Sequence, residues 1–506
     1  MRNTLPQKGR ATPEKNIAIE FSGVKIKIAR EGLTLEALEE LVFDISRGIG
    51  RRAMEEALAG YDEKLREERP RGALKQISRK VRYLQTRIGE IRYRRRLYKE
   101  KDTGSARYLL DEALKLGKNQ RMSLKVSQIL GTLASVEAYR GVAEQISELL
   151  GLRYSHEAIR QNVIKEGIRI EEQEAKGLEK VKLLDYQLPE EIPEVVYTET
   201  DATYIRKQNK GKKKSRKRHL EVKIGINYTG KESRYETGEK NSRKLIRKSI
   251  YTGIKVGRNK FLENLSYISE RDYGLSAVKK SYFGGDGDRW IRTGKDEYFP
   301  LAEYLLCPYH LFERLRKALP GRKEQQRQIK ILFEQNKVTE ALEVVKGIRD
   351  EEYDAEAQEL ISEYFVYVKN NQDGIEASMR LRMEEGQRGA GAVEANIDKT
   401  IVHRFKRRGM SWSERGASAL LKVRQVIVNG QWDAWWYEKR DKKIEIKAIF
   451  KNPLTATNVC KKQDIVPYVE ATLPCYRGPE QSKPWVGVLR ELTRVNLLRE
   501  KLYTVN

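Results

Sequence analysis

The spacing of hydrophobic residues changes along the chain and predicts helices in some segments and strands in others. In residues 33–68 apolar side chains recur at three- and four-residue steps, which predicts an amphipathic helix that Pro70 ends. Residues 81–101 carry aromatic and β-branched side chains among arginines, with Gly89 near the middle, which predicts a basic β-hairpin or short sheet. Residues 1–32 predict a flexible basic arm, since their first twenty or so positions lack periodicity.

Residues 139–163 have the pattern of two helices joined by a glycine turn. Apolar positions at helical spacing form one face of the first helix, residues 151–154 form the turn, and Ser155 is placed to cap the second helix. This is the layout of a helix-turn-helix, whose second helix enters the major groove of DNA, where Arg160 and Gln161 would contact bases. Packing in an ordinary helical bundle explains the same pattern, so both interpretations stay open.

From residue 193 the pattern becomes that of strands. The predicted strands cover residues 195–205, 220–228, 245–256 and 278–283, and residues 261–269 look helical. Three strands, a helix and a fourth strand imply a mixed α/β sheet. The order fits a ribonuclease-H-like fold, in which the first strand carries one catalytic acid and the fourth strand ends at a second.

The whole chain is therefore expected to be a multidomain protein with α/β and α parts. Its predicted parts are a flexible arm (1–32), a helical region with the basic hairpin and helix-turn-helix (33–192), the ribonuclease-H-like domain in two pieces (193–310 and 387–430), a helical insertion between them (311–386), and a C-terminal tail (431–506).

Composition adds a partner to this picture. The 506 residues include 100 Lys and Arg against 73 Asp and Glu, a formal charge of +27, and a surface so basic attracts nucleic acid. No apolar run approaches the roughly 18 residues of a membrane span, and residues 1–16 lack the hydrophobic segment of a secretory signal. Three cysteines without Cys-x-x-Cys pairing support neither a disulfide framework nor a four-cysteine zinc site. We expect a cytoplasmic, nucleoid-associated protein with no membrane partner.

Three acidic residues stand in positions where a metal-dependent site would need them. Asp201 lies within an apolar, strand-like run, Asp286 ends another, and Glu394 opens a helical stripe that should pack on the sheet. Mg²⁺ prefers oxygen ligands and needs few carboxylates, and two such ions activate a water or a 3′-hydroxyl for attack on a phosphodiester. These residues therefore predict a site for two Mg²⁺ or Mn²⁺ ions.

Each acid also has an ordinary explanation. Asp201 could face solvent on an edge strand, although Glu199 shares its face and a carboxylate inside an apolar strand is costly to bury. Asp286 sits between glycines, where a tight turn is common and Asp288 is an equally good acid. Glu394 could simply favour the positive N-terminus of its helix.

Two groups of cations are candidates for phosphate contacts. Nine of the thirteen residues from Arg206 to Arg218 are basic and none is acidic. They are Arg206, Lys207, Lys210, Lys212, Lys213, Lys214, Arg216, Lys217 and Arg218. The helix after Glu394 offers a second group: Lys399, His403, Arg404, Lys406, Arg407 and Arg408. Cys307 and His310 have Cys-x-x-His spacing, but no second pair accompanies them, so a zinc site is not expected.

Three motifs resemble a known family. Thr200-Asp201-Ala202-Thr203, Gly285-Asp286-Gly287-Asp288-Arg289-Trp290-Ile291, and Glu394-Ala395-Asn396 followed by Lys406-Arg407-Arg408-Gly409-Met410-Ser411-Trp412 are similar to motifs of bacterial insertion-sequence transposases. That family was long filed as uncharacterised and is related to the Mutator-like DDE transposases. The resemblance spans about residues 77–427 and implies that Asp201, Asp286 and Glu394 bind the metal ions. Cys307 and His310 resemble a Cys/Asp-x-x-His motif of the Mutator-like enzymes, although Asp is commoner than Cys in this branch.

The resemblance implies a transposase that binds the ends of its element, cleaves DNA and joins the freed 3′-hydroxyls to target DNA, assembling as a homo-oligomer on DNA. Two other functions are compatible with the same residues. One is a non-catalytic, decayed or domesticated DNA-binding protein, which three intact acids argue against. The other is a ribonuclease-H-like nuclease that acts on RNA or branched DNA, which differs only in substrate.

Overall fold

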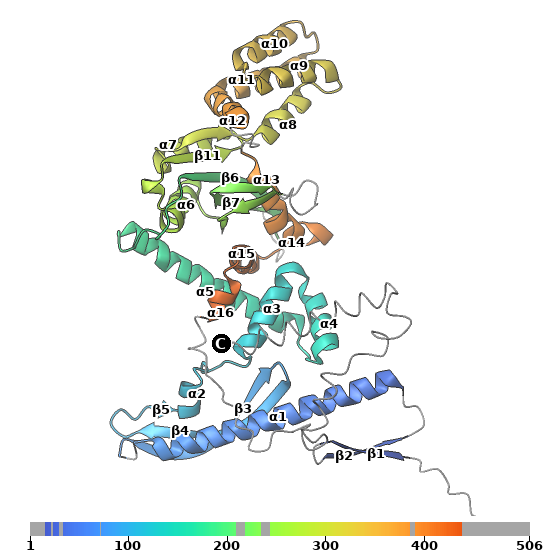
Figure 1. Ribbon diagram of the computed structural model, residues 1–506, viewed down its shortest axis with the longest axis vertical. Helices are drawn as coiled ribbons and strands as arrows, with labels where there is room; N and C mark the ends of the chain where they lie inside the picture. Colours follow the sequence, from blue (N-terminus) through green and yellow to red (C-terminus); the bar gives the residue numbers. More distant parts are fainter. Residues whose placement is uncertain are drawn as a thin grey trace, which may run out of the picture. The chain divides into compact units, whose positions relative to one another are not determined.

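The computed structural model describes residues 16–21, 24–29, 34–70, 72–208, 218–233, 243–384 and 390–437 (Figure 1). The chain forms two compact units, residues 1–41 with 442–506, and residues 42–441. In the first unit β1 (Asn16–Phe21) and β2 (Val24–Ala29) pair in an antiparallel hairpin, so this part of the predicted arm is regular structure. The alternating sequence Val24-Lys25-Ile26-Lys27-Ile28 accounts for that pairing.

Helix α1 (Leu35–Glu68) ends before Pro70, as predicted, and leads into an antiparallel hairpin of β3 (Leu74–Thr86) and β4 (Gly89–Glu100). Short elements β5 (Ala106–Arg107) and α2 (Leu109–Ala113) follow. Several hairpin arginines are used internally: Arg96 pairs with Asp62 at 2.6 Å, and Arg82 pairs with Asp111 at 2.6 Å. The basic composition of the hairpin thus overstates its free positive charge.

The predicted pair of helices is present as α4 (Tyr139–Leu150) and α5 (His156–Lys182), preceded by α3 (Leu124–Val136). Gly151 ends α4 with a φ of 55°, and the Ser155 hydroxyl accepts a hydrogen bond from the Ala158 N–H at 3.1 Å. A Cβ at Gly167 would lie 2.2 Å from the Ala419 carbonyl oxygen, so α5 crosses another helix with the backbones in close approach.

The central sheet has the strand order β10-β7-β6-β11-β12. Its strands are β6 (Val195–Arg206), β7 (His219–Tyr228), β10 (Ser249–Ile254), β11 (Lys280–Gly285) and β12 (Glu303–Leu306). Strands β6, β7 and β10 are antiparallel neighbours, whereas β11 runs parallel to β6 and to β12. β6, the first strand of this sheet along the chain, is therefore its central strand, and the mixed sheet agrees with the predicted α/β class.

The strand predicted over residues 245–256 is in fact two strands. Arg243–Ile246 (β9) pairs with Gly230–Ser233 (β8), and β10 begins only at Ser249. Arg247, between them, has a φ of 46°, a left-handed conformation that extended strands do not contain. Hydrophobic pattern alone does not show such a break.

Alternate residues of β6 lie on opposite faces of the sheet. On one face the Thr198 hydroxyl donates to Asn227 Oδ1 at 2.7 Å, which also accepts from Ser269 of α6 (Arg258–Tyr273) at 3.0 Å. The other face, with Glu199 and Asp201, meets α13 (Ala392–Ile397). Helix α7 (Arg289–Tyr298) follows β11, and α15 (Glu414–Val428) contacts α5 and β10.

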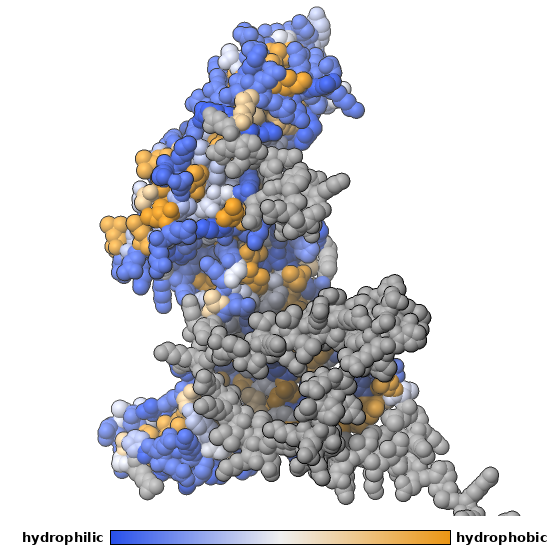
Figure 2. Space-filling model, in the orientation of Figure 1, coloured by the Kyte–Doolittle hydropathy of each residue, from blue (hydrophilic) through white to orange (hydrophobic). Residues whose placement is uncertain are grey.

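The predicted helical insertion consists of α8 (Pro308–Ala318), α9 (Lys323–Glu334), α10 (Val338–Asp350), α11 (Ala355–Asn370) and α12 (Gln372–Glu384). It has its own core, which includes the buried side chains Ile329, Phe333, Val345 and Val368. Its surface carries mainly hydrophilic residues in Figure 2. Helix α12 contacts β12, the last strand of the sheet, so the insertion is joined to the sheet domain by packing as well as by the chain.

The expected irregular tail begins with a packed helix. In α16 (Trp432–Tyr437) the Trp432 indole donates to the Thr132 hydroxyl at 2.9 Å, and Asp433 accepts from Gln128 at 2.7 Å. These residues of α16 therefore pack against α3. The remaining tail, 438–506, lies outside the described residues. Within the described ranges no helix has both the length and the apolar character needed to cross a bilayer.

Candidate active site

Asp201 lies in the middle of β6 on the face toward α13. It is 7% exposed, and one carboxylate oxygen accepts a hydrogen bond from the Ala202 N–H at 2.6 Å. The strand is central in the sheet, which rules out the solvent-facing edge position that the sequence left open. Asp201 pairs with Ile224 of β7, and β11 pairs with β6 as far as Glu199, two residues earlier, so the position of this carboxylate is set by the sheet.

Asp286 follows the last residue of β11, the strand next to β6. Its carboxylate accepts a hydrogen bond from the Asp288 N–H at 2.9 Å, which closes a tight turn. Gly287 has a φ of 90°, and a Cβ there would lie 2.7 Å from the Tyr367 ring, so this turn requires glycine. Asp288 is exposed and faces Arg314 at 3.6 Å. The tight turn that the sequence offered as an explanation for Asp286 is thus present, and a role of its carboxylate in metal binding stays a prediction.

Glu394 comes from the first turn of α13, which continues into a π-helical turn (Asp398–Val402) and α14 (His403–Phe405). The stripe predicted to pack on the sheet is buried, with Ile397, Ile401 and Phe405 at most 7% exposed. Glu394 begins that stripe and is partly exposed at its edge. π-Helical turns are rare in proteins, and those that occur are often at functional sites.

The three carboxyl groups are close enough to influence one another's ionisation. Burial, then the charges of Glu394 and Asp286, raise the pKa of Asp201 to about 8. Burial also raises the pKa of Asp286 and of Glu394. Ionised carboxylates that are buried close together repel one another, and a bound cation would stabilise their ionised forms.

Cys307 and His310 adjoin this cluster at the start of α8. The potential ligand atoms of Cys307, His310 and Glu394 all lie within 4.8 Å of one another, and His310 Nε2 is 3.5 Å from a Glu394 oxygen. Burial raises the pKa of the Cys307 thiol to about 12. Sequence spacing alone does not indicate this group, because its third member, Glu394, comes from another helix.

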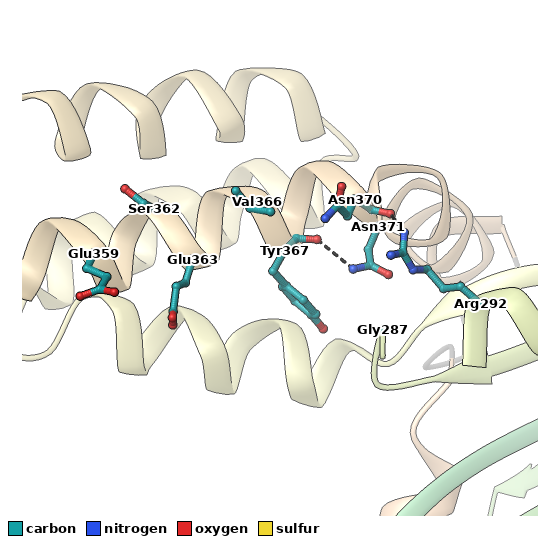
Figure 3. Close-up of a pocket in the computed structure, with 9 residues that line it drawn as sticks. All are labelled: Gly287, Arg292, Glu359, Ser362, Glu363, Val366, Tyr367, Asn370 and Asn371. Atoms are coloured by element: carbon teal, nitrogen blue, oxygen red, sulfur yellow. Dashed lines mark hydrogen bonds between the residues drawn. The ribbon is translucent and has the colours of Figure 1, made fainter. Parts of the chain in front are cut away.

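The insertion contacts the turn that carries Asp286. The Tyr367 hydroxyl, on α11, donates to the Asp286 carbonyl oxygen at 2.8 Å. An open pocket of about 430 Å³ lies beside this turn, and Figure 3 shows Tyr367, Asn371 and Arg292 around it near Gly287. Asn371 in turn donates to the Tyr367 carbonyl at 2.8 Å. Tyr367 was missed from the sequence, because nothing near it in the chain links it to an acid 81 residues away.

Some of the predicted phosphate-contacting cations lie near the acids. Lys406 is exposed and donates to the Thr203 hydroxyl at 2.6 Å, two residues along β6 from Asp201. Arg407 is exposed beside Asp398. Arg206, Lys207 and Arg218 flank a segment whose other predicted cations, Lys210, Lys212, Lys213, Lys214, Arg216 and Lys217, lie outside the described residues.

Arg404 does not belong with these cations. It is 2% exposed, donates to the Ala134 carbonyl at 2.9 Å, and lies 4.9 Å from the Trp412 ring centroid. Its guanidinium fixes α14 against α3, so the interpretation of Arg404 as a phosphate contact was wrong. The helical pattern placed it among exposed cations, and only the packing of α3 shows that it is covered.

Arg160 and Gln161 lie in the first turns of α5, where a recognition helix would contact bases. Arg160 makes two hydrogen bonds of 2.8 Å to Glu157, and Gln161 makes one of 2.6 Å to the same residue. Gln161 is exposed and Arg160 is partly so. The far side of α5 is buried in the bundle, so bundle packing is present, and a role of the exposed turns in DNA binding stays a prediction.

Comparison with known proteins places the chain in a family. A UPF0236 protein of Caldanaerobacter subterraneus subsp. tengcongensis is 26% identical over 487 residues, 91% of this chain and 94% of the relative. One from Streptococcus gallolyticus is 26% identical, over 81% of this chain and 86% of the relative. A Drosophila P element transposase strand transfer complex overlaps 63% of this chain and 95% of that chain, with 8% identity and a TM-score of 0.29, which establishes neither fold nor function. Residues 28–441 match the family described as an uncharacterised protein family, UPF0236, and the chain belongs to that family.

Proposed function

We propose that this chain is a DDE-type DNA transposase with a ribonuclease-H-like catalytic domain. The observation that carries the proposal is the convergence of Asp201, Asp286 and Glu394. They come from the central strand, the end of the neighbouring parallel strand and a helix beyond the insertion, yet the three carboxyl groups interact. The strand order, with the first strand central and the fourth parallel beside it, supports the ribonuclease-H-like assignment.

The donor set suits divalent cations of the Mg²⁺ type. The three acids offer only oxygen ligands, and a Glu394 oxygen is buried with no hydrogen-bond partner of ordinary geometry among the described residues. Two ions bound there would activate a water or a 3′-hydroxyl and stabilise the leaving oxygen of a phosphodiester. The protein's own part is to hold the acids on a rigid sheet and to turn Asp286 toward them through the Gly287 turn.

DNA is the proposed partner. The +27 charge and the exposed Lys406 beside Asp201's strand would attract and position a phosphate backbone. The name of one relative carries eleven locus designations from a single genome, as a protein encoded by a repeated element would. We also propose that the protein assembles as a homo-oligomer on DNA and that α4 and α5 act as a helix-turn-helix.

The test uses the full-length protein with duplexes that contain the DNA flanking its own coding sequence at both ends. With Mg²⁺ or Mn²⁺ we expect cleavage at those ends and joining to a target plasmid, and with Ca²⁺ we expect binding without cleavage. Cleavage of RNA–DNA hybrids or branched DNA in preference to these ends would favour the nuclease alternative. Binding without cleavage under every metal condition would contradict catalysis and favour a DNA-binding protein.

A further inference from the structure

Glu199 is a buried carboxylate on the same face of β6 as Asp201 and two residues before it. It is only 2% exposed. Gly284, opposite it on β11, makes room for it, because a Cβ at Gly284 would lie 3.1 Å from Glu199 Cγ and 3.3 Å from the Ala390 Cβ. A charge buried this deeply is costly unless hydrogen-bond donors surround it. Glu199 therefore needs hydrogen-bond donors around its carboxylate, and the structure supplies them.

Most of these donors are backbone N–H groups at the start of α13. The Glu199 carboxylate accepts from the N–H groups of Gly391 at 2.9 Å, Ala392 at 3.2 Å and Val393 at 3.1 Å. The first N–H groups of a helix have no partner inside it and carry partial positive charge, which favours an anion. Gly391 has a φ of 126°, a conformation that glycine adopts readily.

One side chain completes the shell around this carboxylate. The Tyr228 hydroxyl donates to Glu199 at 2.6 Å from the neighbouring strand β7. Burial and then the charge of Glu199 raise the pKa of Tyr228, so its hydroxyl keeps its proton and remains a donor. The carboxylate is thus held by the sheet on one side and holds the helix on the other.

The chain reaches α13 only after the whole insertion, 192 to 194 residues after Glu199. Glu394 is the residue immediately after the third N–H donor. Resting on the proposed function, we infer that Glu199 is a positioning residue that fixes the start of α13 against β6 and thereby places Glu394 beside Asp201. Glu199 acts through the backbone of residues 391–393, whereas the three acids would act on the metal ions directly.

Glu199→Gln is the sharpest test, because glutamine has the same shape but only one acceptor oxygen, and its amide NH₂ cannot accept from the helix N–H groups. Glu174→Gln is the matched control. Glu174 is also a largely buried carboxylate that anchors a helix, since it accepts hydrogen bonds from Lys422 and Gln425 of α15. Both substitutions remove a buried anchor, but only Glu199 bonds the first N–H groups of the helix that carries Glu394. Glu174 is connected with that helix only through α15, whose Arg424 donates to the Thr400 carbonyl.

Hydrogen exchange would first show whether the anchor is lost. We expect Glu199→Gln to speed exchange in peptides containing residues 391–393 and to leave α15 unchanged, with the reverse pattern in Glu174→Gln. Mn²⁺ binding, followed by the free-ion electron paramagnetic resonance signal without DNA, then reports on the site. Affinity should fall roughly 10–100-fold in Glu199→Gln, as for other residues that orient metal ligands, and stay near native in the control.

The outcomes separate this inference from the transposase proposal. Native Mn²⁺ affinity together with native Mn²⁺ dependence of cleavage in Glu199→Gln would overturn the positioning role and leave the transposase proposal standing. A native protein that cleaves no DNA, but whose Mn²⁺ affinity falls on the same substitution, would overturn the transposase proposal and support the positioning role. Equal losses of Mn²⁺ affinity in both variants would mean a general stability effect and would also overturn it.

Discussion

The Tyr367 hydroxyl donates a 2.8 Å hydrogen bond to the main-chain carbonyl of Asp286. It joins the helical insertion to the turn that carries one of the three clustered acids. The Tyr367 ring also lies against Gly287, which a larger residue could not replace without moving it. The insertion therefore takes part in shaping the candidate site, besides lengthening the chain between β12 and α13.

Tyr367→Phe should lower metal-dependent cleavage several-fold while costing about 1 kcal/mol of stability, the usual net contribution of one hydrogen bond. The ring still packs, but the turn of Asp286 loses its tie to α11. Tyr364→Phe is the control, because the buried Tyr364 hydroxyl, one turn earlier in α11, has no hydrogen-bond partner among the described residues. Cleavage rates and thermal unfolding should be measured for both variants, and only Tyr367→Phe is expected to cleave more slowly. Equal cleavage rates for the two variants would count against a role of this tie.

The raised pKa of Asp201 predicts how stability depends on pH when divalent ions are removed with EDTA. Between the usual value of 3.8 and about 8 the folded protein binds more protons than the unfolded chain, so stability must fall as pH rises through this range. Asp201→Asn should flatten that fall. Added Mn²⁺ should stabilise the native protein more at pH 8 than at pH 6, because it competes with protons. Thermal unfolding as a function of pH, for the native protein with and without Mn²⁺ and for Asp201→Asn, measures these three effects. If stability falls with pH as steeply in Asp201→Asn as in the native protein, the raised pKa of Asp201 is refuted.

Sequence specificity is predicted to depend on the first turns of α5. Arg160→Ala and Gln161→Ala should each lose on the order of 1–3 kcal/mol of discrimination between the element's ends and scrambled DNA, with little change in affinity for scrambled DNA. Glu157→Ala should strengthen binding to both DNAs, because the Glu157 carboxylate accepts hydrogen bonds from Arg160 and Gln161 in the free protein and so competes with DNA for them. Competition binding at fixed salt measures the ratios. Native specificity in both alanine variants would assign α5 to bundle packing alone.

The local parts of the fold were predictable from the sequence. Gly151 and Ser155 mark the turn between α4 and α5, and the stripe from Ile397 to Phe405 is buried as its spacing indicates. Contacts between distant segments were not predictable. Glu199 visibly shares a face with Asp201, but its helix partners lie 192 or more residues away. Arg404 looks exposed on a helical pattern and is covered by α3.

The proposed role of the three acids is the central claim, and their substitution tests it most directly. Cleavage and joining of element-end DNA in Mn²⁺ should be measured for Asp201→Ala, Asp286→Ala and Glu394→Ala beside Asp288→Ala, whose carboxylate is exposed next to the same turn. We predict that the first three abolish both reactions while binding DNA as the native protein does, and that Asp288→Ala has a milder effect. Native cleavage by any one of the three would contradict its place in the metal site.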